Sequence, residues 1–283
     1  MAATDQAETA ESGTVEGGTV GKALDVLDQV AAFGRPVRFS ELLSESPYPK
    51  ATLYRFVQTL TGLGMLSYDP ERQLYGLGLR LVRLAHGAWQ QSSLAPIART
   101  SVEHLAEKVG ETVHLAQLDA AQVLYVDKRN AAKPNEVYSS AGKVGPAYCT
   151  AVGKAMLAFL PDAERRPILE QQSFHRFTPA TIIDRRGLDA ELATIRGTGY
   201  ALDRQEHEPG NICIAAPIQT AGGWVLGAIS VTASIERMTL HDLEATAPDV
   251  VAAASAIAQS AAAWRFPVSG EISETEKAAE CRV

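Results

Sequence analysis

The sequence lacks the features that mark secreted, membrane-spanning and disordered proteins. Its three cysteines among 283 residues are an odd number, too few for a disulfide framework. No apolar run approaches the roughly 20 residues that cross a bilayer, and the N-terminus carries no basic or apolar region of a secretory signal. Aromatic residues are only 6%, but hydrophobic residues reach 46%, which is enough for a packed, largely aliphatic core. We therefore expect a soluble cytoplasmic protein with no membrane partner.

Positive charge is also scarce, and its only local excess lies near the N-terminus. The net charge of −7 argues against a protein that coats nucleic acid without sequence preference. Residues 1–18 hold four acidic side chains and no basic one, whereas residues 19–89 hold eight basic and six acidic side chains, a local charge of +2. Any contact with DNA is therefore expected within residues 19–89.

The pattern of residues 19–78 predicts three helices followed by a hairpin. Apolar positions recur at helical spacing from Val20 to about Gly34, and Ser40 is a plausible N-cap for a short helix that ends at Glu45. Pro49 fits the first turn of a third helix, whose expected buried stripe is Leu53, Phe56, Val57 and Leu60. Two short strand-like segments, 65–68 and 73–77, flank the turn-forming residues 69–72. This order is typical of a winged helix-turn-helix, in which the third helix enters the major groove.

The opposite face of the third helix carries side chains suited to DNA contact. Lys50 and Arg55 can pair with phosphate or with guanine, and the small Ala51 can approach a thymine methyl group. The same face could be a solvated surface on any helical bundle; the hairpin and the local positive charge favour DNA. The predicted DNA-binding residues are Ser40, Lys50, Ala51, Thr52, Tyr54, Arg55, Gln58 and Arg72.

The remaining chain alternates helix and strand signals. Helices are expected over 77–86, 93–109, 151–160, 162–172, 184–199 and 240–264, the last as one long Ala-rich helix. Strands are expected over 112–118, 122–128, 136–141, 200–203, 211–219 and 224–232. Hairpins mixed with helices indicate an α+β domain, with an antiparallel sheet covered by helices on one face.

Three groups of residues in this half could carry chemistry. The glycine-containing segment 142–154 opens onto a helix, whose first backbone N–H groups can bind a small carboxylate, although glycine can also serve packing alone. Cys149 or Cys213 with a histidine could form a nucleophile and base, which would make the protein a cysteine-dependent hydrolase. Asp203, His207 and Cys213 are metal-ligand types, so a metal-responsive regulator is a further alternative. Buried cysteines acting as small hydrophobic residues are the commoner case.

Two groups of motifs resemble those of a known family. The N-terminal group is residues 22–30 (KALDVLDQV), 49–60 (PKATLYRFVQTL) and the segment ending at 75–78 (YGLG). The C-terminal group is residues 149–157 (CTAVGKAML), 199–210 (GYALDRQEHEPG), 213–217 (CIAAP) and 227–232 (GAISVT). Together they resemble the IclR family of transcriptional regulators over about residues 19–264, which favours this family over the two alternatives above.

The resemblance implies a ligand-controlled transcription factor that is not an enzyme and has no cofactor or resident metal. Its expected partners are double-stranded operator DNA, a small organic, sugar or aromatic acid as effector, and further copies of itself, as a homodimer or a dimer of dimers. The implied effector contacts are Val152, Gly153, Asp203, Cys213, Ser230 and Thr232. Where the family often carries a basic residue, this chain has Asn211 and Ile212, which argues against a strongly anionic effector.

The predicted domain organisation combines the pattern with the resemblance. Residues 1–18 have too few large apolar side chains to offset the entropy of ordering, so we predict a disordered tail there. A winged helix-turn-helix domain follows at 19–78, then a linker helix at 79–92. A GAF-like effector-binding domain, with an antiparallel sheet and helices, is expected at 93–265 and a second tail at 266–283.

Overall fold

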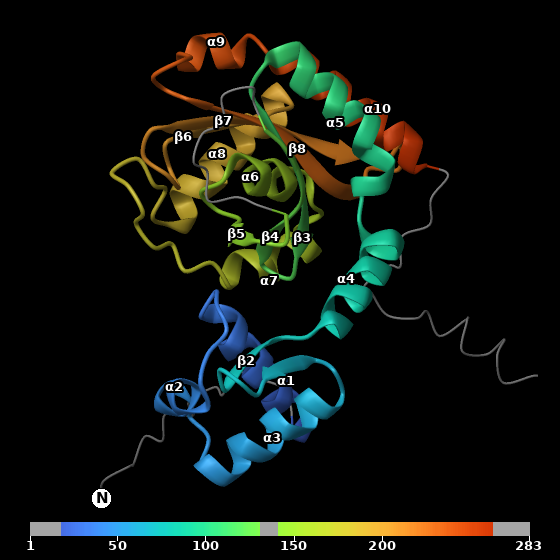
Figure 1. The fold of residues 1–283 in the computed structure, drawn as a ribbon. Helices are drawn as coiled ribbons and strands as arrows, with labels where there is room; N and C mark the ends of the chain where they lie inside the picture. The colour runs from blue at the N-terminus through green and yellow to red at the C-terminus, as the bar shows by residue number, and fades with distance from the viewer. Residues whose placement is uncertain (1–17, 131–140, 263–283) are drawn as a thin grey trace, which may run out of the picture. The chain divides into compact units, whose positions relative to one another are not determined.

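The computed structural model describes residues 18–130 and 141–262, which form two compact units. The first unit ends at Ala88 and the second begins at Trp89, so the boundary falls inside helix α4 (Leu79–Ser92). Figure 1 shows the elements of each unit. Within the described residues, none of the helices combines the length and the apolar character needed to cross a membrane.

The first unit is a winged helix-turn-helix. Helices α1 (Gly18–Ala32), α2 (Phe39–Glu45) and α3 (Lys50–Gly62) precede a hairpin of β1 (Leu66–Asp69) and β2 (Leu74–Leu77). The predicted stripe of α3 is buried against α1 and the hairpin, and Val37 adds a backbone bridge to Tyr75 at the edge of the wing. The Asp69 carboxylate accepts the N–H groups of Glu71 and Arg72, which closes the predicted turn.

One feature of this unit, the start of its second helix, differs from the sequence prediction. Helix α2 begins at Phe39, so Ser40 is not its N-cap but its second residue. The Glu41 carboxylate accepts the backbone N–H of Arg38 at 2.9 Å and satisfies the donor that precedes the helix. Helix α4 has no buried residue, and Leu79, Val82 and Leu84 are 82%, 63% and 54% exposed.

The second unit is built on a six-stranded antiparallel sheet in the order β5-β4-β3-β8-β7-β6. Its strands are β3 (Thr112–Asp119), β4 (Gln122–Arg129), β5 (Val144–Pro146), β6 (Ala201–Arg204), β7 (Asn211–Gln219) and β8 (Val225–Ser234). The predicted strand at 136–141 lies almost wholly outside the described residues, and the strand that pairs with β4 is β5.

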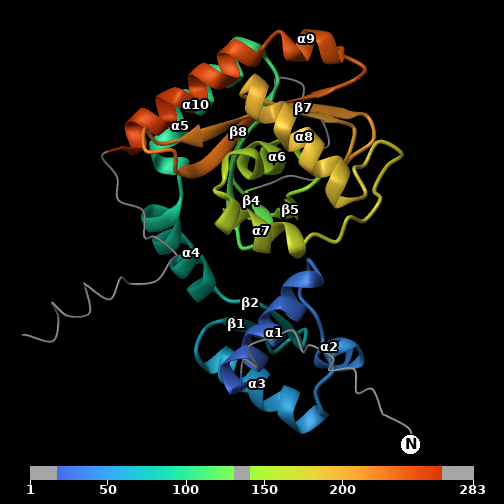
Figure 2. The ribbon, with the colours of Figure 1, turned by 180° about the vertical axis from the view of Figure 1, so that it is seen from behind.

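Helices cover both faces of this sheet, not one as predicted (Figures 1 and 2). Helices α5 (Ala95–Val109) and α10 (Ala247–Ala261) pack on one face, and α6 (Ala151–Phe159) packs on the other, together with α8 (Arg185–Thr198). Along β7, Ile212 and Ile214 point to the α5–α10 side, whereas Cys213 points to the α6 side. Because both faces are covered, strand side chains that point to either face of the sheet are buried.

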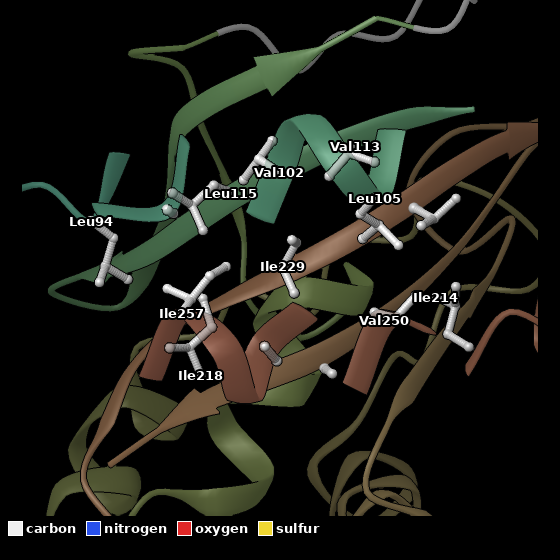
Figure 3. Close-up of a cluster of buried hydrophobic side chains, with 14 of the residues drawn as sticks. Leu94, Val102, Leu105, Val113, Leu115, Ile214, Ile218, Ile229, Val250 and Ile257 are labelled. Atoms are coloured by element: carbon white, nitrogen blue, oxygen red, sulfur yellow. The ribbon is translucent and has the colours of Figure 1, made fainter. Parts of the chain in front are cut away.

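The α5–α10 side holds the larger apolar cluster, shown in Figure 3. Leu94 and the α5 side chains Val102 and Leu105 meet Ile229 of β8 and Val250 of α10. The opposite side has a second cluster, formed by α6, α7 (Asp162–Glu170), α8 and the small residues of the sheet.

The C-terminal helix is broken, where the sequence pattern predicts one continuous helix over 240–264. Helix α9 (Leu240–Glu244) ends before α10 begins at Ala247. Pro248 lies in the first turn of α10, where it cannot donate the N–H that would continue the hydrogen-bond ladder from α9. The break allows the two segments to run in different directions (Figure 1).

Candidate functional site

The exposed face of α3 carries most of the side chains predicted to contact DNA. Because Leu53, Phe56 and Val57 are buried, the opposite side of the helix faces solvent. Thr52 is half-buried, and the other predicted residues of this helix are exposed: Lys50, Ala51, Tyr54, Arg55 and Gln58.

Neighbouring residues orient several of these side chains. The Tyr54 ring packs edge-on against Phe39 of α2, with 5.7 Å between ring centroids. Gln58 Nε2 donates to the Tyr75 hydroxyl of the wing at 3.4 Å. Ser40 is exposed on α2, and the Arg72 side chain is 78% exposed in the turn of the wing. The first unit therefore presents the eight residues on α2, α3 and the wing.

The second unit contains a cavity lined by elements that are distant in the sequence. It lies on the α6 side of the sheet, and its lining comprises His114, Tyr125, Gly145, Thr150, Ala151, Val152, Asp203, His207, Glu208, Asn211, Cys213, Ser230 and Thr232. Five of the six residues that the family resemblance implies as effector contacts are among them, and Gly153 is not.

The N-terminus of α6 opens onto this cavity. Thr150 is the N-cap: its hydroxyl accepts the Gly153 N–H at 3.3 Å, and its carbonyl accepts the Lys154 N–H at 2.9 Å. Among the described residues, no hydrogen-bond acceptor is found for the N–H groups of Ala151 and Val152. Gly153 has a packing role, because a Cβ there would lie 2.3 Å from the Ala147 carbonyl oxygen.

Asp203 is the buried carboxyl group of the cavity. It lies on β6 directly opposite Cys213 of β7, and only 5% of it is exposed. Its Oδ1 accepts the Glu206 N–H at 2.7 Å, and its second oxygen accepts no hydrogen bond from a described residue. Burial, reinforced by the nearby charge of Glu206, raises the pKa of Asp203 to about 7.

A fully buried lysine anchors the turn behind Asp203. Lys154 of α6 donates to Glu206 Oε1 at 2.5 Å, to the Leu202 carbonyl at 2.6 Å and to Glu191 Oε1 at 3.3 Å. Thr178 and Thr181 hold the same turn from outside, donating to the carbonyls of Gln205 and Glu206 at 2.7 and 2.6 Å. These bonds position the segment that brings His207 and Glu208 to the cavity.

A line of weakly polar groups crosses the sheet beneath the cavity. The Thr232 hydroxyl lies 3.2 Å from Cys213 Sγ and 3.3 Å from His114 Nδ1. Burial lowers the pKa of His114 to about 3, so the imidazole is neutral at physiological pH. Burial also raises the pKa of both the Cys213 and the Cys149 thiols.

The surroundings of the two cysteines and of the candidate metal ligands favour neither the hydrolase nor the metal alternative. A nucleophilic cysteine requires a thiolate, and the raised thiol pKa values work against one at both positions. Cys149 is fully buried and does not line the cavity. In the part of the chain that the structure describes, no three His, Cys, Asp or Glu side chains are grouped so that they could hold a metal ion.

Sequence reasoning missed two polar residues of the cavity, His114 and Tyr125, and gave Thr150 and Asn211 no role of their own in ligand binding. His114 belongs to an otherwise apolar buried strand, and a polar side chain at such a position is the signal that could have found it. Thr150 is recognisable as an N-cap before α6. No local signal indicates Tyr125, because only the pairing of β4 with β3 brings it beside His114.

A winged helix-turn-helix joined to a unit with a buried polar cavity defines a ligand-responsive transcriptional regulator. Comparison with known families agrees: the C-terminal model of the bacterial transcriptional regulator IclR matches residues 86–259, and the IclR helix-turn-helix model matches residues 19–70. The chain belongs to the IclR family. It is a transcriptional regulator with an N-terminal DNA-binding domain and a C-terminal effector-binding domain, as its motifs predict.

Individual relatives support the assignment. The HTH-type transcriptional regulator XynR of Escherichia coli strain K12 is 31% identical over 220 residues, which cover 78% of this chain and 87% of XynR. The structure of Thermotoga maritima IclR is similar with a TM-score of 0.69 at 27% identity, covering 85% of this chain and 97% of that protein. An IclR homologue from Microbacterium hydrocarbonoxydans, solved with 4-hydroxybenzoate, shares the fold with a TM-score of 0.74 at 23% identity, covering 86% and 98%.

Proposed function

We propose that the cavity at the N-terminus of α6 binds a small organic, sugar or aromatic acid, and that its occupancy controls operator affinity. The observation that carries this proposal is the meeting of Val152, Asp203, Cys213, Ser230 and Thr232 around one cavity. The two backbone N–H groups at the start of α6 suit one carboxylate, because the helix N-terminus carries a partial positive charge. The ligand in the Microbacterium homologue is an acid of this kind.

Control follows from linkage between the two sites. An effector that binds one arrangement of the protein better than another shifts the population toward it. Two reading helices must match successive major grooves, about 34–36 Å apart, so a change in their separation changes operator affinity. A coupling of about 1.4–3 kcal/mol is enough for a tenfold to hundredfold change.

The effector site is tested by ligand-induced thermal stabilisation of the full chain. A ligand at a hundred times its dissociation constant stabilises by about 2.7 kcal/mol, which corresponds to an upward shift of about 5–10 °C for a unit of this size. Screening small carboxylic, sugar and aromatic acids should give such a shift, and Ser230→Ala should reduce it. Ser234→Ala, at the end of the same strand and outside the cavity lining, serves as the control. A shift that Ser230→Ala leaves unchanged would place the ligand elsewhere.

The DNA-binding face is tested by removing one cation from α3. Arg55→Ala should weaken operator binding by about 1–3 kcal/mol at fixed salt, because a phosphate or guanine contact is lost. Arg185→Ala is the matched control: it removes the same charge from an exposed site on α8, where Arg185 pairs with Asp189 one turn away. Gel-shift titration measures both, and equal affinities for the two variants would refute the assignment of Arg55.

The partner for the exposed apolar groove of the first unit is a second copy of this chain. The groove runs between α1, α3 and α4, and Val20, Leu24, Leu63 and Leu84 on its border are 52–73% exposed. A dimer with two-fold symmetry also matches an operator with two half-sites. Leu24→Glu places a charge in the groove and should shift the protein toward monomers, as measured by sedimentation equilibrium. The mass of the wild-type protein in the same experiment distinguishes a dimer from a dimer of dimers. Val251→Glu, on an exposed position of α10, is the control.

The remaining assignments follow from this role. The protein acts by binding DNA and effector rather than by catalysis, and the raised pKa of the Cys213 thiol supports this. It needs no cofactor, and its site of action is the cytoplasm, where bacterial DNA is found.

A further inference from the structure

The cavity of the second unit is small. Its volume is about 30 Å³, a fifth of the roughly 150 Å³ of an engineered protein cavity that binds benzene. One water-sized group needs about 10–15 Å³, so the free space holds two or three such groups. An aromatic ring or a six-carbon sugar acid therefore fits only if a wall of the cavity moves.

Tyr125 has the largest side chain among the described residues that line the cavity. The register of β4 against β3 shifts beside it, because Val126 is an extra residue in β4 that no residue of β3 faces. Such a bulge redirects the side chains on either side of it. Tyr125 points to the α6 side of the sheet, whereas Val126 is buried on the α5–α10 side. The Tyr125 ring thus forms one wall of the cavity.

Neighbours on both sides hold the Tyr125 ring in place. On one side His114 of β3 packs edge-on against it, with 5.5 Å between ring centroids. On the other side lies Gly145 of β5, where an added Cβ would be 3.4 Å from Tyr125 Cε2. The backbone is fixed as well, because the Tyr125 N–H donates to the Lys143 carbonyl at 3.0 Å and the Tyr125 carbonyl accepts the Gly142 N–H at 2.8 Å. The ring is therefore a fixed wall.

The Tyr125 hydroxyl is a donor that faces the cavity. It lies 3.8 Å from the position of an added Gly145 Cβ, and the charge of Asp203 acts on it across the cavity. Among the described residues, none forms a hydrogen bond with it. Burial, reinforced by this charge, raises the pKa of Tyr125, so the hydroxyl keeps its proton at physiological pH. A donor in this position favours a ligand that brings an oxygen acceptor.

Resting on the proposed function of this cavity, we propose that Tyr125 limits the effector to acids of two or three carbons and donates its hydroxyl hydrogen to an oxygen of that acid. The ring sets the size limit, because it fills space that a longer or aromatic acid would need. The hydroxyl contributes binding, because an acid of the right size satisfies a donor that no described residue satisfies.

The test compares small and large acids by isothermal titration calorimetry on the full-length protein. Glycolate and lactate are the small acids, and benzoate and gluconate are the large ones. Each carries a single carboxylate, so Asp203, Glu208 and Lys128, the cross-strand neighbour of His114, meet the same net charge in every titration. We expect the tighter small acid to bind at least about tenfold more strongly than either large acid, because a large acid must displace a packed wall.

Two variants separate the ring of Tyr125 from its hydroxyl. Tyr125→Ala removes the wall and should raise benzoate affinity at least about tenfold relative to the small acid. Tyr125→Phe keeps the wall and removes the donor, so it should weaken the small acid about tenfold and still exclude benzoate. Tyr200→Ala is the control for ring removal: Tyr200 packs on the α5–α10 side of the sheet, so the preference should stay unchanged. Should Tyr125→Ala fail to fold, the wild-type protein and Tyr125→Phe decide.

The outcomes separate the two proposals. Benzoate or gluconate binding as tight as that of the small acids in the wild-type protein would overturn the size limit and leave acid binding intact. An unchanged preference in Tyr125→Ala would overturn the role of the ring, and unchanged small-acid affinity in Tyr125→Phe would overturn the role of the hydroxyl. If none of the four acids binds and the wider acid screen is also negative, the cavity is not an acid site, and both proposals fail.

Discussion

Replacing Lys154 by methionine is expected to lower the free energy of unfolding of the second unit by about 3–5 kcal/mol. Lys154 is fully buried, and its ammonium group is 2.5 Å from Glu206 Oε1. Methionine has a similar length but no charge, so the substitution leaves the Glu206 carboxylate buried without its cation. The backbone N–H of Arg204, 3.4 Å from Oε1, is then the remaining donor, and Oε2 has no hydrogen-bond partner among the described residues.

Glu191 is less affected by this change, because Arg204 also donates to it at 3.0 Å. The loss of stability in Lys154→Met should therefore come mainly from the unpaired Glu206 carboxylate. The double variant Lys154→Met/Glu206→Leu removes both charges and should recover most of the lost stability. Failure of the double variant to recover any would show that packing, not the orphaned charge, accounts for the effect.

Tryptophan fluorescence during urea unfolding measures this change in the appropriate unit. The three tryptophans, Trp89, Trp224 and Trp264, all fall within residues 89–283, the range of the second unit. Lys108→Met is the matched control: Lys108 pairs with Asp249 at 2.7 Å but is 55% exposed, so its loss should cost under about 1 kcal/mol. Comparable losses for Lys108→Met and Lys154→Met would contradict the argument from burial.

Replacing Gly153 by alanine should destabilise the second unit by about 1–3 kcal/mol and weaken effector binding. The added Cβ would lie 2.3 Å from the Ala147 carbonyl oxygen and 2.5 Å from its Cα. These are backbone atoms, so no side-chain rotation relieves the contact, and the start of α6 must move away from the segment that carries Ala147. The same movement displaces the N–H groups of Ala151 and Val152 from the cavity.

Gly197→Ala provides the control for this substitution. Gly197 lies within α8, and a Cβ there would meet no atom within 4 Å. Alanine should stabilise that helix by about 0.5–1 kcal/mol, because glycine loses more backbone entropy on folding. Urea unfolding of both variants measures the change in stability at each position. The thermal shift produced by any acid that binds measures the change in effector binding. A neutral or stabilising effect of Gly153→Ala would show that this close approach relaxes freely.

Local signatures in the sequence predict the face of α3 and the implied effector residues, and these assignments stay predictions. The buried stripe of α3 follows from apolar spacing, and an exposed opposite face follows from the same period. The implied effector residues Asp203, Cys213, Ser230 and Thr232 came from short motifs, each read within its own segment. Gly153 belongs to such a motif too, but the structure shows its N–H bonded to Thr150 and its Cα packed against Ala147.

By itself, the sequence determined the type and approximate position of most helices and strands, because capping residues and apolar periodicity act over a few residues. Tertiary structure alone decided that Asp203, Cys213 and Thr232 face one cavity with His114, since this depends on β8 lying between β3 and β7. It also decided that helices cover both faces of the sheet. Pairing between strands more than a hundred residues apart is set by the burial of the whole domain, and no local pattern encodes it.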